Sequence, residues 1–406
     1  MILTGWSRKD ALVQVYTLPY VRIIREMLPA EFDILLVTME PAGEGKKSRD
    51  EDKQNGINWI PLRYHPFGVR GLLTWVMNLF RLLGIVLSGK TACIHAWCMP
   101  AGSLGYLLSK VARVPLVIDS YEPHAEAMVE NLTWKKNSLR FRLLFYFEKK
   151  LSHHATAVIA AAAGMRDYAF AKYHALPSFF YVKPACVDLG YYSRFERKDP
   201  QLLKELKLED KLVCVYAGKF GGIYLADEVF DFFSVAAARW GDRFRVLLLT
   251  NHPRETLNIW ASRSGFDLQQ AVIGFIPPEK MPVYLGLADF AITPVKPVPT
   301  KRYCTPIKDG EYWAMGLPVI ITDKISDDSD LIESHQAGAV LKRLDREAYS
   351  DALDKIESLL SSGGQAAMHD RIRKIAEDHR NFAQARQIYK ELYTLVIPLQ
   401  AQGSPR

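Results

Sequence analysis

The chain has 406 residues, of which 49% are apolar and 24% charged, and its net charge is +7. This length predicts about two domains, and the composition is that of a globular protein with sizeable cores. The positive charge suits anionic ligands or an anionic membrane surface, but it is too diffuse to indicate nucleic-acid binding.

Cysteines and the N-terminus bear on the compartment. The five cysteines, at positions 93, 98, 186, 214 and 304, are scattered and contain no CxxC pair, which favours reduced thiols over disulfides or a zinc site. Charged residues at 8–10 argue against a signal peptide, and no uncharged apolar run reaches the roughly 20 residues that span a bilayer. We therefore expect a cytoplasmic protein.

In chain order, the first half alternates between strands and helices. Residues 44–55 are polar and predict a loop. Strands are expected at 1–4, 32–39, 57–62, 92–96, 115–119, 155–160 and 179–182, and helices at 11–28, 72–87, 103–112, 137–151 and 165–173. This alternation predicts a parallel, doubly wound sheet, in which ligands bind beyond the carboxyl ends of the strands. Those ends carry Gly5, Trp97 and the segment 119–124.

The segment Asp119-Ser-Tyr-Glu-Pro-His124 is the richest of these strand ends. Asp119, Glu122 and His124 place two carboxylates and an imidazole within six residues, and such groups can hold a hydroxyl or transfer a proton. The alternative, with equal weight, is a polar loop whose side chains cap the next helix.

Two segments could meet a membrane. Residues 70–87 have few charges, and residues 134–150 interleave six basic residues with aromatic ones, as a basic amphipathic helix on anionic lipid does. For 70–87 we favour a core helix. For 134–150 both interpretations stay open, the other being a sheet-covering helix with a solvated edge.

The second half begins with a polar linker at 188–211 and repeats the alternation. Strands are expected at 212–217, 244–251, 271–274, 289–294, 317–321 and 339–341, with helices between and after them. The turn Gly218-Lys-Phe-Gly-Gly222 follows a buried strand and precedes a helix, so its amides and Lys219 could bind phosphate. The alternative is a tight turn without a ligand, which we slightly favour on this feature alone.

The stretch 300–322 predicts a loop, a short helix and a buried strand. Thr305 could N-cap the helix with Pro306 at its first position, and Gly316 could end it in a left-handed turn. Lys308 in the first turn opposes the helix dipole unless an anion sits there, and Glu311 shares its face. This pair suits a phosphate and a ribose diol; the alternative is a surface salt bridge.

The second half also resembles the donor domain of retaining family 4 glycosyltransferases with the GT-B fold. The resemblance rests on an ordered series of motifs that spans nearly the whole chain. It comprises Tyr216-Ala-Gly-Lys219, Val272-Ile-Gly-Phe-Ile276, Met281-Pro-Val-Tyr-Leu-Gly-Leu-Ala-Asp289, Thr305-Pro-Ile-Lys-Asp-Gly-Glu-Tyr-Trp-Ala-Met-Gly-Leu-Pro-Val319 and, before the second domain, Pro184-Ala-Cys-Val-Asp188.

The resemblance implies two Rossmann-like domains facing across a cleft: residues 1–190 for the acceptor and 191–380 for a UDP- or GDP-linked sugar, with a helix in 381–406 packing back on the first.

The resemblance also implies roles for single residues. Lys219 and Lys308 would contact the diphosphate, Glu311 would contact the ribose, and backbone near Phe275 and Ile276 would contact the base. Further donor-side candidates are Gly218, Phe220, Gly221, Gly222, Asn251, Tyr303 and Thr305. Acceptor-side candidates are Gly5, Trp97, Asp119, Glu122 and His124. The catalytic candidates are His124, Lys219, Lys308 and Glu311. No cofactor and no metal site are expected, because lysines and amides can neutralise the leaving group.

Three departures from the family pattern stand out. Tyr303 occupies the place of the first Glu of the E-x7-E motif, which contacts the donor sugar in the family. Leu225 occupies the place of a second phosphate-binding cation, for which Lys301 and Arg302 are candidate replacements. Ser120 occupies the place of a catalytic-site histidine, and His124 lies four residues later.

We therefore expect a glycosyltransferase that builds a surface polysaccharide or glycolipid, acts on a glycan or lipid-linked acceptor, and is cytoplasmic or peripheral on the inner face of the membrane. The alternatives are a nucleotide-sugar epimerase or hydrolase on the same fold and a catalytically silent sugar-nucleotide-binding scaffold.

Overall fold

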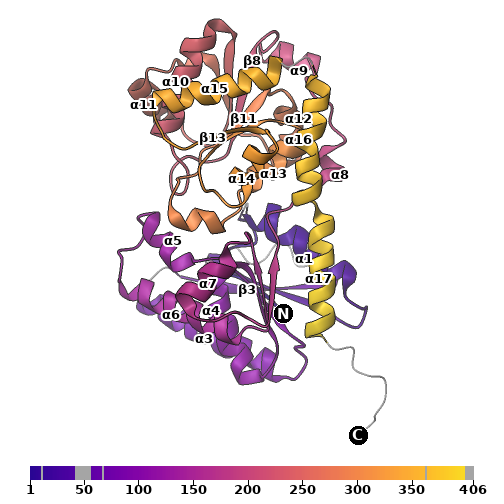
Figure 1. Ribbon diagram of the computed structural model, residues 1–406. Coiled ribbons are helices and arrows are strands. Elements are labelled where there is room, and N and C mark those ends of the chain that lie inside the picture. Colours follow the sequence, from indigo (N-terminus) through magenta and orange to yellow (C-terminus); the bar gives the residue numbers. More distant parts are fainter. Residues whose placement is uncertain (11, 42–55, 66–67, 362–363, 398–406) are drawn as a thin grey trace. The chain divides into compact units, whose positions relative to one another are not determined.

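The computed structural model describes residues 1–10, 12–41, 56–65, 68–361 and 364–397, so the predicted polar loop at 44–55 lies outside the described residues. The chain forms two compact units (Figure 1). Unit 1 comprises Met1–Lys183 together with the chain from Ala383 onward, and unit 2 comprises Pro184–Phe382. The first boundary thus falls at Lys183, ahead of the division at 190–191 that the sequence suggested.

Unit 1 is built on a parallel, seven-stranded sheet of order β3-β2-β1-β4-β5-β6-β7. The strand order reverses between β1 and β4, and this reversal defines the ligand-binding edge of a doubly wound sheet. The strands are β1 (Ile2–Thr4), β2 (Ile34–Pro41), β3 (Ile57–Tyr64), β4 (Ile94–Trp97), β5 (Leu116–Tyr121), β6 (Ala157–Ala160) and β7 (Phe179–Val182).

Helices connect these strands and cover the sheet. They are α1 (Leu18–Met27), which continues from a π-helix η1 (Val13–Thr17), then α3 (Val69–Leu87), α4 (Cys98–Ala112), α5 (His124–Glu130), α6 (Leu139–His154), α7 (Met165–Tyr173) and α17 (Phe382–Val396). Ser138 caps α6 by accepting a hydrogen bond from the Phe141 amide. In Figure 1 the C-terminal helix α17 runs along the sheet of unit 1.

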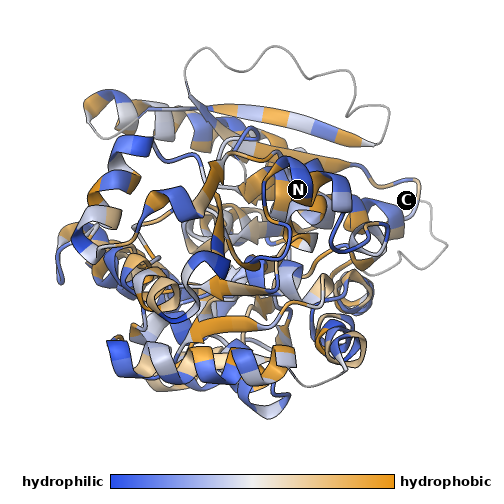
Figure 2. Cartoon of the chain, turned by 90° about the horizontal axis from the view of Figure 1, so that it is seen from above, coloured by the Kyte–Doolittle hydropathy of each residue, from blue (hydrophilic) through white to orange (hydrophobic). Residues whose placement is uncertain are grey.

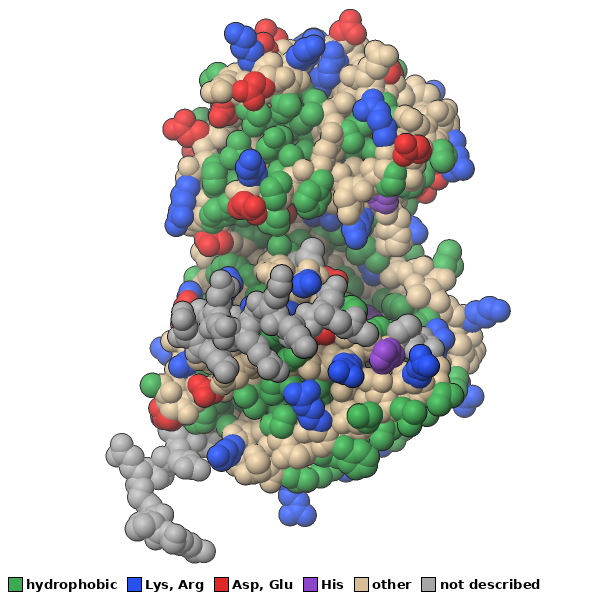
Figure 3. Space-filling model, turned by 180° about the vertical axis from the view of Figure 1, so that it is seen from behind, with side chains coloured by type: hydrophobic (Ala, Val, Ile, Leu, Met, Phe, Trp, Pro, Cys, Tyr) green, Lys and Arg blue, Asp and Glu red, His purple; other side chains and the backbone are tan. Residues whose placement is uncertain are grey.

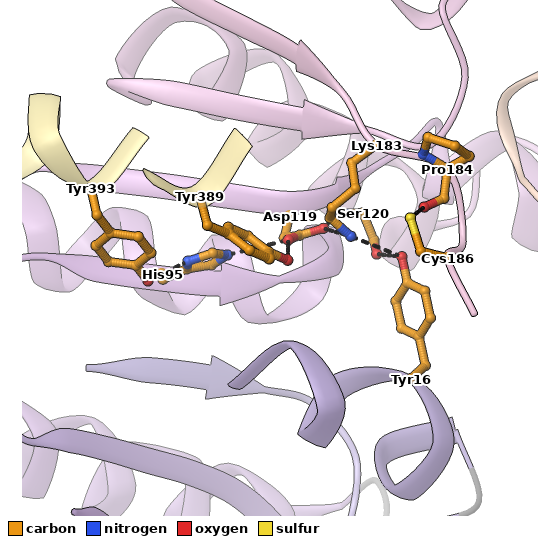
Figure 4. Close-up of polar contacts among 9 residues, drawn as sticks. All are labelled: Tyr16, His95, Asp119, Ser120, Lys183, Pro184, Cys186, Tyr389 and Tyr393. Atoms are coloured by element: carbon orange, nitrogen blue, oxygen red, sulfur yellow. Dashed lines mark hydrogen bonds and ion pairs between the residues drawn. The ribbon is translucent and has the colours of Figure 1, made fainter. Parts of the chain in front are cut away.

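A buried polar network ties α17 to this sheet (Figure 4). The Tyr393 hydroxyl lies 2.8 Å from Nδ1 of His95, and the Tyr389 hydroxyl donates to Asp119 at 2.7 Å. Lys183 Nζ lies 3.3 Å from the same carboxylate and 3.7 Å from the centre of the Tyr20 ring. Burial alone would raise the pKa of Asp119, but Lys183, His95 and Tyr389 lower it to about 2. The carboxylate is therefore ionised and fully committed within the fold.

Unit 2 contains a parallel six-stranded sheet of order β10-β9-β8-β11-β12-β13, with its reversal between β8 and β11. The strands are β8 (Leu212–Ala217), β9 (Phe244–Leu249), β10 (Ala271–Gly274), β11 (Phe290–Thr293), β12 (Val319–Thr322) and β13 (Gly338–Leu341). Alternate β8 residues enter opposite cores: Val213 and Val215 on one face, Cys214 and Tyr216 on the other. The unit 2 sheet is thus covered on both faces, and Figure 2 shows hydrophobic residues along the strands.

The helices of unit 2 complete the second doubly wound half and confirm the predicted α/β class. They are α8 (Leu189–Tyr192), α9 (Pro200–Glu205), α10 (Asp227–Trp240), α11 (Arg254–Ser264), α12 (Met281–Gly286), α13 (Ile307–Ala314), α14 (Asp328–Ser334), α15 (Arg346–Ser361) and α16 (Gln365–His379). The region 188–211, expected as a linker, contains α8 and α9; Asp188 and Asp199 cap them.

Helix α3 differs from its prediction as a core helix. Only Leu82 and Val86 along it are buried, whereas Met77 and Phe80 are 71% and 68% exposed. Among the helices of the described residues, α3 is the one whose length and composition would suffice to cross a membrane. The apolar pattern predicted the helix, but the pattern alone could not show how little of the helix packs against the rest of unit 1.

The buried network predicts a specific stability defect in unit 1. Asp119→Ala should lower its free energy of unfolding by about 3–5 kcal/mol, because Lys183 would be left buried without its counter-charge. In the wild type, the stability contributed by ionised Asp119 should be lost as the pH falls from about 4 toward 2, because the folded-state pKa lies below the unfolded one. Native-state hydrogen exchange of the β5 amides measures both effects.

Arg386→Ala is the matched control, since it breaks an exposed ion pair to Glu26 (Nη1–Oε2 2.6 Å) in the same unit. This change should cost about 0–1 kcal/mol. Equal losses for the two variants would show that the buried network does not anchor α17.

Candidate functional site

The stretch 300–322 lies at the carboxyl edge of the unit 2 sheet, beside the strand-order reversal. It forms a 3-10 turn η5 (Pro299–Tyr303), then α13 and β12. One detail corrects the prediction. The helix begins at Ile307, because Pro306 has an extended ψ of 123°, and the Thr305 hydroxyl lies 3.0 Å from the Ser326 hydroxyl.

Gly316 ends this helix in the predicted left-handed turn, with φ +69°. A Cβ there would lie 2.9 Å from the carbonyl oxygen of His369, and His369 Nδ1 lies 2.7 Å from the Gly316 oxygen. Glycine is therefore required at this position by both conformation and space.

Lys308 points from the first turn of α13 to the end of β8. A Cβ placed on Gly218 would lie 2.9 Å from Lys308 Nζ, so a larger residue at 218 would push the end of the Lys308 side chain away from the turn. The ammonium lies 4.0 Å from the centre of the Tyr224 ring, and the side chain is 9% exposed. A nearly buried cation thus lies against a glycine turn, beside the backbone amides of that turn.

Buried acids fix the first turn of α13 from beneath. Asp309 accepts a hydrogen bond from Thr293 at the end of β11, and burial together with the charge of Asp328 raises its pKa well above the usual value. Asp328 is in turn paired with the buried Arg380. These contacts hold the backbone that carries Lys308. They could not be predicted from the sequence, because the partners lie far apart along the chain.

Glu311 lies one turn after Lys308 on α13 and is partly exposed. Burial raises its pKa to about 7, although the Lys308 charge and a hydrogen bond from Tyr192 act in the opposite direction. The predicted pairing of a cation and a carboxyl group on one helix face is therefore present. The Tyr192 contact, from α8 in the supposed linker, was not predicted.

The glycine turn after β8 is rigidly supported. The Tyr216 hydroxyl donates to the Lys219 carbonyl at 2.5 Å, the Ala217 amide donates to the Tyr312 hydroxyl at 3.0 Å, and the Phe220 amide donates to His252 Nε2 at 2.9 Å. The Lys219 side chain is exposed, whereas Phe220 is buried in the core. Phe220 therefore supports the turn through packing, and Lys219 is the residue that can reach a ligand.

Strand register brings further candidates to the same edge. Ala217 pairs with Leu249, and Leu249 with Gly274, so the residues that follow these strands share one edge of the sheet. The following residues Asn251 and Phe275 are exposed, Phe275 by 68%, and Ile276 is partly buried. Tyr303 and Thr305, just before α13, are partly exposed.

The residues proposed to replace the absent second cation are less available. Leu225 is 6% exposed and belongs to the hydrophobic core. Lys301 is 4% exposed, and Arg302 forms an ion pair with Asp330 at 2.9 Å. Lys219 and Lys308 are consequently the better-placed cations of this edge.

The strand ends of unit 1 divide into exposed and buried candidates. Gly5 is exposed after β1. Trp97 and Asp119, expected to face an acceptor, are each 1% exposed: Trp97 stacks on His95, and Asp119 belongs to the network described above. Neither side chain therefore faces an acceptor as expected. A side chain at a strand end can point into the core when it has buried partners there.

Glu122 and His124 remain partly exposed, with His124 Nδ1 2.9 Å from Glu122 Oε1. Glu148 on α6 supports this pair by accepting the Ala125 amide at 2.7 Å, which fixes the start of α5. Burial raises the pKa of Glu148 to about 8. In the sequence, Glu148 stood out only as the single acidic residue of the basic segment 134–150.

Comparisons with known proteins agree with this architecture. Residues 17–177 match the family model described as glycosyl transferase 4-like domain. No curated protein matches the chain. Among solved structures, sucrose-phosphate synthase from Thermosynechococcus elongatus is similar with TM-score 0.72 and 15% identity, covering 97% of this chain and 99% of that one.

Two further structures are similar over the same extent. Anabaena HepE in complex with UDP-glucose has TM-score 0.70 and 14% identity, covering 97% of this chain and 99% of that one. WaaG, a glycosyltransferase involved in lipopolysaccharide biosynthesis, has TM-score 0.69 and 13% identity, covering 98% and 99%. These findings confirm the GT-B fold and the resemblance to family 4 glycosyltransferases.

The raised pKa of Glu311 predicts a pH-dependent stability. Between pH 4.5 and about 7 the unfolded carboxyl group is ionised while the folded one keeps its proton, so the free energy of unfolding of unit 2 should fall by about 2–3 kcal/mol over this range. Glu311→Gln should lack this fall. Denaturant unfolding of both proteins from pH 5 to 8 gives the difference.

Glu333→Gln, in an exposed ion pair with Lys342, serves as the control and should keep the wild-type pH profile. Parallel profiles for Glu311→Gln and the wild type would contradict a raised pKa at Glu311.

Proposed function

We propose that the protein transfers a sugar from a nucleotide-sugar donor to a glycan or glycolipid acceptor, with retention of anomeric configuration, in surface polysaccharide or glycolipid synthesis. The observation that carries this proposal is the placement of Lys308 against the Gly218 turn, with Glu311 on the same helix face. Doubly wound sheets bind nucleotides at this edge, beside the strand-order reversal.

In the proposed complex, each group has a distinct task. The Lys308 ammonium and the amides of the glycine turn bind the diphosphate, and the exposed Lys219 adds a second charge. Glu311 accepts hydrogen bonds from the ribose hydroxyls, and the backbone at Phe275 and Ile276 contacts the base. These cations stabilise the diphosphate as it leaves, so the reaction proceeds without a metal ion.

A uridine nucleotide is the proposed donor carrier. HepE has been solved with UDP and with UDP-glucose, and a trehalose-6-phosphate protein from E. coli with UDP-2-fluoro glucose. On the acceptor side, His124 is the proposed base or sugar contact, because its imidazole is partly exposed and held by Glu122. The leaving phosphate assists deprotonation on the face from which the acceptor attacks.

Peripheral attachment to the inner face of the membrane is the second part of the proposal. Besides Met77 and Phe80, α3 exposes Val69 (76%) and Leu72 (64%), and α6 exposes Leu139 (81%). Figure 3 shows hydrophobic side chains gathered on a face of unit 1 with Lys and Arg side chains beside them. An exposed apolar surface next to cationic groups suits anionic lipid.

The donor site predicts which substitutions weaken nucleotide binding. Lys308→Ala and Glu311→Ala should each weaken UDP binding about 10- to 100-fold, because each removes a hydrogen-bonding group that contacts the nucleotide in the proposed complex. Lys342→Ala, which removes a 66%-exposed lysine of the same unit, should leave it unchanged. Titration calorimetry with UDP measures all three.

A product assay separates the proposed activity from its alternatives. With UDP-glucose alone, a transferase leaves most of the donor intact, whereas an epimerase or hydrolase converts it. With a panel of glycan and lipid-linked acceptors, turnover that resists EDTA supports metal-independent transfer. UDP binding without turnover on any acceptor would favour the silent scaffold.

The membrane surface predicts a loss of vesicle binding for Met77→Asp. Burying one large apolar side chain is worth about 1.5–3 kcal/mol, so this variant should bind anionic vesicles at least about tenfold more weakly. Ile259→Asp, at a 53%-exposed position on α11 of unit 2, is the matched control. Co-sedimentation that is equal for both variants would contradict a membrane role for α3.

A further inference from the structure

A cavity of about 550 Å³ lies inside unit 1 between α3 and the carboxyl ends of its first strands. Its volume falls in the range of about 300–1,000 Å³ typical of small-molecule sites. Apolar side chains form most of its wall: Leu3, Val37 and Met39 from the strands, Leu104 from α4, Leu143 from α6, and Leu72 and Trp75 from α3. The cavity therefore suits an apolar ligand.

Two polar contacts keep α3 in place above this cavity. Asn78 Nδ2 donates to the Arg63 carbonyl at 2.9 Å, and Arg81 Nη1 donates to the Pro61 carbonyl at 3.3 Å. Both acceptors belong to β3, so the helix is tethered at its middle. The N-terminal half of α3 packs little: Leu72 is 64% and Trp75 43% exposed although both line the cavity. Covering water-exposed apolar walls with a hydrocarbon is favourable, because it removes apolar surface from water.

Part of the cavity wall is polar. Thr4 and Gly5 line it at the end of β1, the edge where a doubly wound sheet binds ligands. Arg63 and His65 line it as well, and Arg63 is exposed. A guanidinium group and an imidazole beside an apolar chamber match a molecule with a hydrocarbon chain and an anionic group such as phosphate.

We infer that this cavity binds the hydrocarbon chain of a lipid-linked acceptor, with Arg63 and His65 at the phosphate that follows the chain. Calling the ligand the acceptor rests on the proposed function, but chain binding itself does not. The exposed apolar residues of α3 continue from the membrane surface to the cavity wall, so a chain can pass from the bilayer to the site without crossing water.

Alkyl phosphates test the cavity directly on the full-length protein. Each methylene that leaves water is expected to strengthen binding by up to roughly fourfold. Calorimetry below the micellar concentration should therefore show octyl phosphate binding at least tenfold more tightly than butyl phosphate, and inorganic phosphate binding most weakly.

Thr74→Trp fills the cavity from α3 and should weaken octyl phosphate binding at least tenfold, since Thr74 lines it. Leu73→Trp is the matched control on the same helix, at a 58%-exposed position outside the lining, and should change binding less than twofold. Leu143→Trp, from α6, repeats the test should Thr74→Trp unfold. Met77→Asp, which impairs vesicle binding, should leave octyl phosphate binding intact.

Several outcomes would overturn the inference: equal affinity for octyl and butyl phosphate, unchanged binding in both cavity-filling variants, or loss of binding in Met77→Asp, which would assign the effect to the α3 surface. UDP titration on the same samples separates the two proposals. Octyl phosphate binding without UDP binding would refute the proposed function and keep the cavity; UDP binding without a chain-length effect would do the reverse.

Discussion

The close approach of Lys308 to Gly218 is the constraint on which the donor-side architecture depends. The ammonium group lies against the end of β8 in the space that a Cβ on residue 218 would take, and the φ of +140° at this residue also favours glycine. Asp309, Asp328 and Arg380 then fix the helix that carries the lysine. A cation held in place before a ligand arrives loses little conformational entropy on binding, which is the physical basis of a preorganised anion site.

Much of this arrangement could be predicted because it is local. Alternating apolar strands and helices indicated both parallel sheets, and the spacing of Lys308 and Glu311 placed them on one helix face. The motif at 305–319 carried the site because its glycine and proline positions are fixed by backbone geometry. Contacts between distant segments were not predicted: Tyr192 with Glu311, His252 with the Phe220 amide, and Glu148 with the Ala125 amide each join residues whose pairing no local pattern indicates.

The wrong predictions share one physical cause. The pattern of polar and apolar residues along the chain shows which residues can be buried, but it does not show which other element packs against them. Asp119 follows a buried strand as a catalytic carboxylate would, yet Lys183 and Tyr389 enclose it. Helix α3 has the composition of a core helix, yet most of it remains exposed. In both cases the deciding information is which other element covers the residue, and α17, from the far end of the chain, supplies it for Asp119.

The two units consequently rely on different forces. Unit 2 offers charge, with Lys219, Lys308 and the partly exposed Glu311 at a strand edge, whereas unit 1 offers apolar area on α3 and in the cavity beside it. Charge attraction is screened by salt over about 8 Å at physiological ionic strength, but hydrophobic burial is not. Added salt should therefore weaken binding of a nucleotide more than binding of a hydrocarbon chain, and the two proposed sites keep these two chemistries in separate units.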